Sequence, residues 1–438
     1  MQEVRQNHPM IDKRELEFIL REQKQELDFK AKSKICDRAE ESQVDLESNL
    51  AQVIIGVRRS GKSTLCLNVL KKAGVAFGYA NFDDERLKSL GVDELNNVLE
   101  VLYKINGEFS HLFLDEVQNV DGWHLFVNRL LRRGMKVILT GSNAKLLSGE
   151  LATHLTGRHS TVELFPFSFK EYCDYRQVDT EELTTVAEAA RRAAFDEYLK
   201  HGGFPELLTE KNSRKYVSNL VRDILERDIR QRHKVKYFAA FERLAQHLMN
   251  VAPTTVSLAE LSKTFGIRAA QTTDNYINYL KQAYLLVGLN KYSVKSRQRM
   301  TEEKVYPVDV AVMDQRADAM AGENLGWRLE TIVYLELLRR AETENMDIYY
   351  YKKDSRAKEV DFAVCKGNKV MALYQVAYDL TSEKTRKREL DALLQASVET
   401  GCETLLLITD TRRETLDIGG RRIKAVPAYE WLLESPED

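Results

Sequence analysis

The residues with the clearest chemical potential form one glycine-rich segment, Gly56-Val57-Arg58-Arg59-Ser60-Gly61-Lys62-Ser63, followed by Thr64. The apolar run VII precedes it and the helical pattern TLCLNVLKKAG follows it, a context that a chance glycine-rich turn would not reproduce. Glycines let such a loop turn its backbone N–H groups toward a polyphosphate at the start of a helix. We expect Lys62 to reach the β- and γ-phosphates, Ser63 to bind Mg²⁺ and Thr64 to lie near the α-phosphate. The segment therefore predicts a site for ATP and Mg²⁺.

Two carboxylates follow the next strongly apolar run, in Leu112-Phe113-Leu114-Asp115-Glu116. Ligands of open α/β sheets bind at the carboxyl ends of the strands, where such a run would emerge. We expect Asp115 to hold the Mg²⁺ shell and Glu116 to orient or deprotonate the attacking water. The alternative is that both acids only cap a helix start. Glu116 is the residue that favours hydrolysis over simple binding.

A third apolar run, MKVILTG, ends in Thr140, Gly141, Ser142 and Asn143. A polar side chain there, above all Asn143, could sense whether the γ-phosphate is present. Turn and cap chemistry is the competing explanation, because Ser and Asn favour helix starts.

Five segments in this order resemble a known family: GVRRSGKST, LFLDEVQNV, LTGSNAKLL, LTGRHSTVELFPFSFKEY and HGGFPE. They look like the prokaryotic AAA-type ATPases that carry a conserved C-terminal domain of unknown function. The resemblance implies that Arg58 and Arg59 contact phosphates or a partner. It also implies that Arg158 is a sensor or arginine finger, in cis or from a neighbouring subunit, that neutralises charge on the transferred phosphoryl group. A surface arginine paired with an acid such as Glu163 is the plainer alternative.

Composition favours a large cytoplasmic protein. The chain has 438 residues, 43% hydrophobic and 30% charged, and a formal charge of -2, so nucleic-acid binding would need a local basic patch. Five scattered cysteines without a CxxC pair indicate reduced thiols. The polar N-terminus has no signal-peptide core, and no apolar run approaches the ~20 residues of a membrane helix. We expect no membrane partner.

Apolar runs and helical patterns alternate along the chain, which predicts a multidomain α/β fold with parallel βαβ units in its first half. The strands expected there are 51–56, 75–82, 111–116, 135–141 and 160–165. The predicted domains are an N-terminal helical segment (1–48), an AAA-like P-loop core (49–167), a helical region (168–238), a winged-helix module (239–300) and a restriction-endonuclease-like α/β domain, expected to be degenerate (301–438).

The stretch from Thr254 to Tyr292 reads as helix–turn–helix followed by a strand, and it resembles a winged helix. In versions that bind DNA, the second helix enters the major groove. The candidate contacts are Lys263, Arg268, Gln271, Thr272 and Thr273, with Lys291, Lys295, Arg297 and Arg299 in a basic stretch, 291–299, near the wing. A module used only for protein packing is the alternative.

Glu330, Asp361 and Gln375 resemble the metal-binding residues of a restriction-endonuclease-like core, with a helix expected at 323–340 and strands at 346–352, 359–365 and 370–378. Such a site also needs a lysine after the third residue to polarise water. Ala377 stands there instead, so we expect a degenerate fold used for binding or dimerisation. Lys352, Lys353 and Lys358 are nearby alternatives for the missing charge.

These features together predict a Mg²⁺-dependent ATPase, acting as a homo-oligomer, whose nucleotide state switches the other modules, with DNA as the candidate partner. Two rival functions are a regulatory switch that binds ATP with little hydrolysis and acts through protein partners, and a nuclease gated by ATP.

Overall fold

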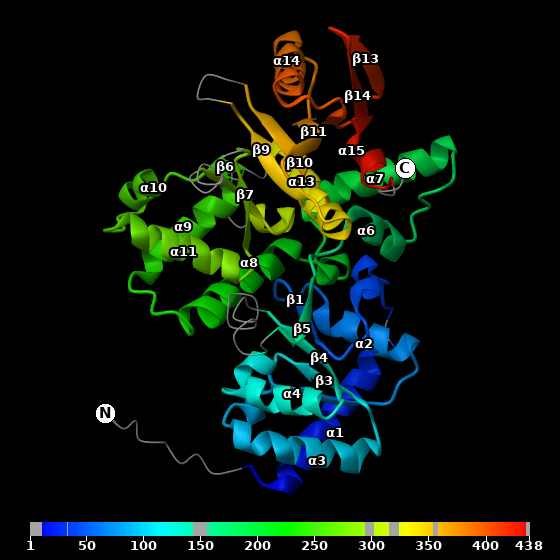
Figure 1. Ribbon diagram of the computed structural model, residues 1–438, viewed down its shortest axis with the longest axis vertical. Coiled ribbons are helices and arrows are strands. Elements are labelled where there is room, and N and C mark those ends of the chain that lie inside the picture. Colours follow the sequence, from blue (N-terminus) through cyan, green and yellow to red (C-terminus); the bar gives the residue numbers. More distant parts are fainter. Residues whose placement is uncertain are drawn as a thin grey trace. The chain divides into compact units, whose positions relative to one another are not determined.

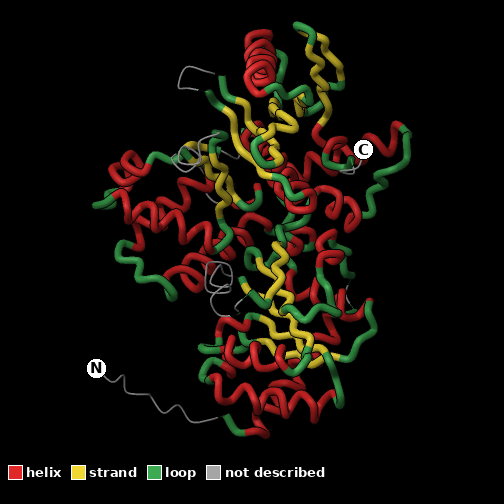
Figure 2. Tube along the Cα trace, viewed as in Figure 1, coloured by secondary structure: helices red, strands yellow, loops and turns green. Residues whose placement is uncertain are grey.

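A computed structural model describes residues 11–32, 34–142, 155, 157–251, 253–293, 302–314, 324–353 and 358–434. They form two compact units, residues 1–165 and 166–438 (Figure 1). In both units helices surround β-sheet, as the colours of Figure 2 show.

The first unit is built on a five-stranded sheet in which all strands run parallel, in the order β2-β3-β4-β1-β5. The strands are β1 (Ala51–Ile55), β2 (Phe77–Asn81), β3 (His111–Asp115), β4 (Lys136–Gly141) and β5 (His159–Glu163). All five predicted strands are therefore present. Every residue of β1 and β3 is buried, as expected of strands covered on both faces.

The helices of this unit are α1 (Lys13–Lys30), α2 (Lys62–Lys72), α3 (Leu95–Asn106) and α4 (Trp123–Arg132). Leu27 of α1 and Leu65 of α2 belong to one core with Ile54 and Phe113 of the sheet. Neighbouring strand residues such as Val53 and Leu112 are also buried and point to the opposite face, because side chains alternate along a strand. The sheet is thus covered on both sides.

The N-terminal segment expected to be helical, 1–48, extends too far, because α1 ends at Lys30. Its buried residues recur at helical spacing up to Leu27 and then stop. The segment that follows contains only a short 3-10 turn, Ala39–Gln43, and its polar side chains bond to α2 instead.

The strand order decides where chemistry can occur in the first unit. β4 lies between β1 and β3, so the residues that end these three strands meet at one edge of the sheet. The phosphate-loop segment follows β1, Asp115 ends β3, and Thr140 lies in β4. The sequence predicted the strands, but pairing of distant strands established their order.

The second unit begins with helices and a small antiparallel sheet, ordered β6-β8-β7. The helices are α6 (Phe169–Arg176), α7 (Thr185–His201), α8 (Ser213–Asp223), α9 (Phe238–Asn250), α10 (Leu258–Phe265) and α11 (Ala270–Gln282). The strands are β6 (Thr254–Thr255), β7 (Leu286–Asn290) and β8 (Glu303–Pro307). The boundary expected between residues 300 and 301 separates β7 from β8, although they pair over five residues.

A six-stranded mixed sheet forms the rest of the second unit, in the order β13-β14-β12-β11-β10-β9. Its strands are β9 (Asp347–Tyr351), β10 (Val360–Lys366), β11 (Lys369–Ala377), β12 (Leu405–Thr409), β13 (Glu414–Ile418) and β14 (Arg421–Pro427). The helices are α13 (Leu325–Glu344), α14 (Glu383–Thr400) and the short α15 (Ala428–Trp431). The hairpin of β13 and β14 was not predicted.

This sheet lies between two cores. β10 sends Phe362 and Val364 into a core shared with α13, and Ala363 and Cys365 into a second core shared with α14. The alternation of β10 therefore builds a three-layered arrangement of helix, sheet and helix.

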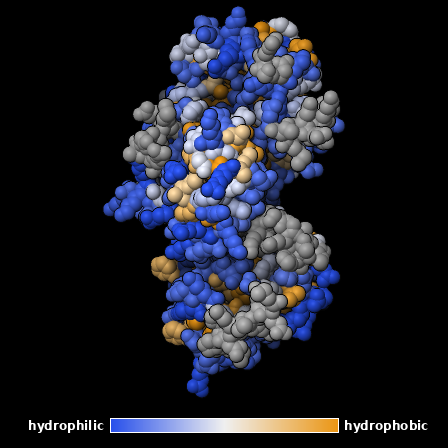
Figure 3. Space-filling view, turned by 90° about the vertical axis from the view of Figure 1, so that its left-hand side faces the viewer, coloured by the Kyte–Doolittle hydropathy of each residue, from blue (hydrophilic) through white to orange (hydrophobic). Residues whose placement is uncertain are grey.

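All five cysteines are free, as predicted. Among the described residues, every helix is too short or too polar to cross a membrane. The face in Figure 3 is largely hydrophilic, and hydrophobic residues are exposed there in separate small areas.

The motif HGGFPE ends α7 at a point where two chain segments approach very closely. A Cβ on Gly202 would lie 1.8 Å from Oδ1 of Asp309, and one on Gly203 would lie 2.2 Å from the carbonyl oxygen of Phe167. The Gly203 N–H donates to Oδ2 of Asp309 at 2.8 Å. Both glycines are thus required by packing inside the second unit.

We predict that Gly202→Ala destabilises the protein by about 3 kcal/mol or more, because Gly202 has φ 76° and ψ -169°, a conformation that side chains rarely adopt, and lacks room for a methyl group. Gly401→Ala is the matched control. Gly401 has φ 72° and ψ 12° in open space, so about 1 kcal/mol is expected. Urea unfolding followed by tryptophan fluorescence measures both, and equal shifts of the two midpoints would show that the close approach to Asp309 is unimportant.

Candidate nucleotide site

The loop between β1 and α2 adopts backbone conformations that glycine permits. Gly56 has φ 143° and Gly61 has φ 98°, and Gly61 is the N-cap of α2. A Cβ on Gly56 would lie 2.1 Å from the carbonyl oxygen of Leu164, so the loop packs against the chain just after β5. Arg59, with φ 70°, is the one non-glycine residue of the loop in the left-handed region. The loop is held at the amino end of a helix, where anions bind.

The polar groups of the loop face inward. Lys62 is buried, and its Nζ donates to the carbonyl oxygens of Gly56 at 3.1 Å and Val57 at 2.9 Å. The Ser60 hydroxyl is buried without a hydrogen-bond partner among the described residues. An orphaned hydroxyl, a buried ammonium and a helix start are the donors that a polyphosphate needs, so these residues fit the triphosphate of ATP.

Asp115 joins the loop to the neighbouring strands. Oδ1 accepts from the Ser63 hydroxyl at 2.9 Å and from the Thr140 hydroxyl, and Oδ2 accepts from the Tyr79 hydroxyl at 3.3 Å. Mg²⁺ prefers oxygen ligands and is usually held by one or two carboxylates together with phosphates and water. Ser63 and Asp115 supply such oxygens. Among the described residues, no group of three His, Cys, Asp or Glu side chains could hold a metal ion alone, so phosphates would have to complete the shell.

Glu116 stands in a conformation that non-glycine residues seldom adopt, with φ 52° and ψ 41°. Its N–H donates to the Thr140 hydroxyl at 3.1 Å. Its Oε2 accepts from the N–H of Ser142 at 3.3 Å, from the Ser142 hydroxyl at 3.0 Å and from the Gln118 amide. Residues in this backbone region cluster at functional sites, where surrounding contacts hold them. Here the contacts to Glu116 come from Thr140 of β4 and from Ser142, the residue just after β4.

The pKa values of the two neighbouring carboxyl groups, Asp115 and Glu116, are shifted in opposite directions. Burial and the charge of Glu116 raise the pKa of Asp115, against the hydrogen bonds from Thr140 and Ser63. Burial also acts to raise the pKa of Glu116, but the charges of Lys62 and Arg58 and the bonds from Gln118 and Ser142 outweigh it and lower the pKa. The lowered pKa favours the ionised form of Glu116, which is the form that a general base needs.

The remaining predicted residues of the site are placed differently. Arg58 lies in the loop with its guanidinium 3.3 Å from Asp83, and Arg59 and Thr64 are exposed. Asn143 lies outside the described residues. Arg158 is exposed, and its carbonyl oxygen accepts from the N–H of Ala51, the first residue of β1.

Arg158 thus lies at the amino edge of the sheet, whereas the phosphate loop lies at the carboxyl edge. β5, which follows Arg158, has five residues, a length of about 16 Å. The expectation that Arg158 could act on its own loop in cis is therefore wrong. Glu163, its suggested alternative partner, is at the far end of the same strand.

Three residues of this site were missed by sequence reasoning. Gln118 lies within the family-like segment LFLDEVQNV and could have been found there. Tyr79 is hidden in a strand pattern. Arg38, which donates to the loop carbonyl of Ser60, precedes the domain and carries no motif.

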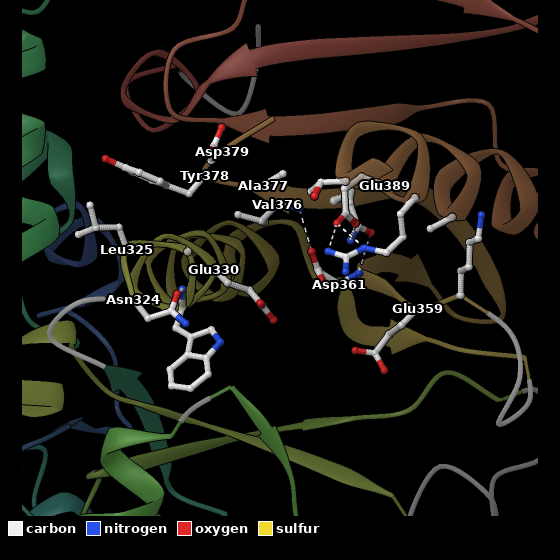
Figure 4. Close-up of a pocket in the computed structure, with 17 residues that line it drawn as sticks. Asn324, Leu325, Glu330, Glu359, Asp361, Val376, Ala377, Tyr378, Asp379 and Glu389 are labelled. Atoms are coloured by element: carbon white, nitrogen blue, oxygen red, sulfur yellow. Dashed lines mark hydrogen bonds and ion pairs between the residues drawn. The ribbon is translucent and has the colours of Figure 1, made fainter. Parts of the chain in front are cut away.

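A second candidate site is a cavity of about 840 Å³ beside the six-stranded sheet (Figure 4). Glu330, Asp361, Gln375 and Ala377 all line it, so the fold brings the predicted nuclease-like residues together. Of the lysines considered, Lys358 also lines the cavity, whereas Lys352 and Lys353 form ion pairs with Glu359 and Glu399.

Three acids of this cavity accept hydrogen bonds from neutral groups. Asp361 Oδ2 accepts from the Val376 N–H at 2.8 Å, and the Gln375 amide donates to Glu389 at 2.8 Å. Glu330 accepts from the Tyr306 hydroxyl at 2.8 Å. These partners occupy one carboxylate oxygen of Asp361 and one of Glu330.

Lys304, on β8, supplies a positive charge that the sequence did not suggest. It is buried, and its Nζ lies 2.5 Å from Glu359 and 3.8 Å from Glu330. Burial acts to lower the pKa of Lys304, but the charges of Glu330, Asp361 and Glu359 outweigh it and raise the pKa. A charged lysine is thus fixed beside the cavity as an internal counter-ion.

Fewer of the candidate residues on and around α10 and α11 are available to contact nucleic acid than the sequence suggested. Thr273 is buried and hydrogen-bonded to Ser262 at 2.8 Å, so its proposed contact with DNA is wrong. Lys263, Arg268 and Gln271 are exposed and Thr272 is half-buried. Lys291 pairs with Glu302 at 3.1 Å. Lys295, Arg297 and Arg299 lie outside the described residues.

The AAA domain family matches residues 48–173. Two domains of unknown function, DUF8612 and DUF4143, match residues 192–321 and 325–431. The chain is 33% identical to the uncharacterized protein MJ1544 of Methanocaldococcus jannaschii, over 97% of this chain and 96% of that protein. It is 30% identical to an uncharacterized protein of Haemophilus influenzae, over 89% of this chain and 95% of that protein. The chain belongs to the family of these two proteins. Its AAA domain agrees with the resemblance in the motifs, and the chain is of the AAA ATPase type.

Alignments with solved structures are looser. The Thermotoga maritima RuvB Holliday junction branch migration motor aligns over 61% of this chain and 88% of that chain, at 15% identity and a TM-score of 0.28. AMPPCP-bound DnaA from Aquifex aeolicus aligns over 55% of this chain and 83% of that chain, at 19% identity and a TM-score of 0.24. Scores of this size do not establish a common arrangement of the whole chain.

Proposed function

We propose that the protein is a Mg²⁺-dependent ATPase whose nucleotide state switches its other modules. One observation carries the proposal. A single chain of hydrogen bonds runs from the Ser63 hydroxyl to the Asp115 carboxylate, on to the Thr140 hydroxyl and then to the backbone N–H of Glu116. The phosphate loop, the candidate metal ligand and the candidate base therefore lie together at one edge of the sheet without a bound ligand.

Each residue then has a specific part. Backbone amides of residues 56–63 and the Lys62 ammonium bind the phosphates, and Thr64 lies near the α-phosphate. Ser63 and Asp115 would hold Mg²⁺, which supplies positive charge to the phosphate oxygens when bound. Glu116 would orient the attacking water and accept its proton. Ser142 and Asn143 would report the γ-phosphate.

Arg158 enters this proposal only from a neighbouring copy. It is exposed at the amino edge of its own sheet, so a homo-oligomer would have to bring it to the loop of the next subunit. An arginine supplied in this way stabilises the charge of the transition state. The ATPase rate per subunit should then rise with protein concentration.

Two substitutions test the ATPase proposal. Lys62→Ala should abolish ATP binding, because it removes the buried ammonium of the loop, which we expect to bind the phosphates. Glu116→Gln should bind ATP as tightly as the wild type and lose about 100-fold or more in turnover, because the amide cannot accept a proton. Calorimetric titration with Mg²⁺-ATP and steady-state phosphate release measure the two properties.

Single-turnover phosphate release separates the ATPase from the regulatory switch. The switch has its own support, because Ser142 and Gln118 already occupy Oε2 of Glu116. Tight binding with turnover near zero in the wild type would favour the switch. Comparable turnover in Glu116→Gln would show that Glu116 is not the base.

We also propose that α9 to α11 and β6 to β8 form a winged helix for which duplex DNA is the candidate partner. The exposed Arg268 and Gln271 at the start of α11 support it, whereas the pairing of Lys281 and Lys291 with acids reduces the positive charge available. The wing would then have to supply most of the phosphate contacts.

The double variant Lys295→Glu/Arg297→Glu should weaken DNA binding about tenfold or more. The binding constant should also depend less steeply on salt concentration, by the amount expected for the loss of about two phosphate contacts. The matched control is Lys211→Glu/Lys215→Glu, which makes the same charge change on exposed lysines elsewhere in the second unit. Gel shifts across a salt series measure both. Equal losses in the two variants, or no shift in the wild type, would favour a module that binds protein.

For the cavity beside the six-stranded sheet we propose binding without cleavage. Ala377 occupies the position of the required lysine, and the carboxylates are bonded to Lys304, Tyr306 and the Val376 amide. An ATP-gated nuclease is the alternative, since Glu330, Asp361 and Gln375 do share one cavity.

Plasmid DNA incubated with the protein, ATP and either Mg²⁺ or Mn²⁺ should stay intact. Nicking that disappears in Asp361→Ala and persists in Asp347→Ala would establish the nuclease instead. Asp347 is an exposed aspartate on β9 of the same sheet, so it controls for the loss of one negative charge.

A further inference from the structure

Arg38 lies in the segment between α1 and β1, outside the matched AAA domain, yet it reaches into the nucleotide site. The residue is 6% exposed. Its Nη1 donates to the carbonyl oxygen of Ser60 at 3.1 Å, and its Nη2 donates to the carbonyl oxygen of Phe165 at 2.8 Å. One buried guanidinium therefore joins two backbone positions that are far apart in the sequence.

The bond to Ser60 follows from the geometry of a phosphate-binding loop. A loop that turns its N–H groups toward a polyphosphate must turn carbonyl oxygens the other way. A buried carbonyl oxygen needs a donor, since leaving it unpaired costs about 1–3 kcal/mol. Arg38 is that donor for Ser60, and its charge makes the bond stronger than one between neutral groups.

The segment that carries Arg38 is itself attached to the helix that follows the loop. Asn68 of α2 donates to Asp37 at 3.0 Å and to Glu41 at 2.7 Å. Lys72, also on α2, lies 2.7 Å from Asp37 and 2.8 Å from Glu41. These contacts lie on both sides of Arg38 in the sequence, so the segment that carries it is attached to the middle and the end of α2.

The second acceptor, Phe165, is the last residue of the first unit, and Pro166 begins the second. The same stretch also contacts the end of β1 and the start of the loop. The Leu164 N–H donates to the carbonyl oxygen of Ile55 at 2.8 Å, and the Leu164 carbonyl oxygen faces Gly56. Residues 164 and 165 are thus held from two sides by the phosphate loop, directly at Gly56 and through Arg38 at Ser60.

We propose that Arg38 is a positioning residue that couples the phosphate loop to the junction at Phe165–Pro166. A change of the loop backbone at Ser60 on nucleotide binding moves the guanidinium and alters the backbone at residues 164–167. The second unit thereby receives the nucleotide signal through the chain that connects it to the first. This inference rests on the proposed ATP binding and specifies the residue through which binding would act.

Hydrogen–deuterium exchange of the full-length protein tests the coupling, with and without saturating Mg²⁺-AMPPNP. In the wild type, the nucleotide should change exchange at residues 164–167 by about tenfold, the effect of about one charge-assisted hydrogen bond. In Arg38→Met this nucleotide-dependent change should vanish at saturating AMPPNP, while protection of α2 by the nucleotide persists. Arg38→Lys should retain only part of the change. Its ammonium keeps the positive charge but lacks the forked guanidinium that bridges two carbonyl oxygens.

Arg21→Met is the control, since Arg21 is half exposed on α1 and pairs with Glu17. It should respond to AMPPNP as the wild type does. A full change at residues 164–167 in Arg38→Met, or none in a wild type that binds AMPPNP, would overturn the coupling and leave the ATPase proposal intact. Calorimetry that shows no AMPPNP binding to the wild type would instead refute both. If Arg38→Met does not fold, Arg38→Lys is compared with Arg21→Met instead. A nucleotide-dependent change in exchange at residues 164–167 that is undiminished in Arg38→Lys would contradict the role of the forked guanidinium.

Discussion

The nucleotide site depends on the hydrogen bonding of one buried carboxyl group, that of Asp115. A carboxylate taken out of water is costly unless donors surround it. Ser63 from the loop, Thr140 from β4 and Tyr79 from β2 provide those donors. The contacts therefore tie three strands and the phosphate loop to a single point. Burial still raises the pKa of Asp115, so a cation placed beside it would be stabilising.

The second unit solves a similar electrostatic problem in the opposite way. Around its cavity, Glu330 and Glu359 lie near the ammonium of Lys304, which is buried with them. This counter-ion offsets only part of the cost of desolvating the acids, because burial still raises the pKa of Glu330 and raises that of Asp361 well above its usual value. Within the part of the chain that the structure describes, the nucleotide site presents a buried hydroxyl without a hydrogen-bond partner, whereas Glu330 and Glu359 of the cavity lie against a buried ammonium. This contrast supports the proposal that catalysis takes place in the first unit.

The domain recognised from its motifs is smaller than the part of the chain that builds the site. Arg38 precedes the matched AAA region, and the loop carbonyl of Ser60 accepts from it. α1 also contributes, because the Gln23 amide donates to the carbonyl oxygen of Asn81 at 3.0 Å, at the end of β2. These contacts join residues far apart in the sequence and follow no spacing rule, so a pattern in the sequence could not reveal them.

The sequence by itself determined the phosphate loop, the carboxylates at the end of β3, the five strands of the first unit and β9 to β11 of the second. Such features are local, because glycines at fixed spacing, apolar runs and strand-ending acids each follow from short-range chemistry. It also identified Glu330, Asp361 and Gln375, which share one cavity. Only the tertiary structure decided which groups meet across distance. Insertion of β4 between β1 and β3 brought Thr140 to Asp115, and the direction of β5 placed Arg158 at the far edge of its sheet. Burial removed Thr273 from any DNA surface and brought Lys304 to the acids of the cavity. Strand order and burial arise from packing between distant segments, and for that reason the local sequence could not specify them.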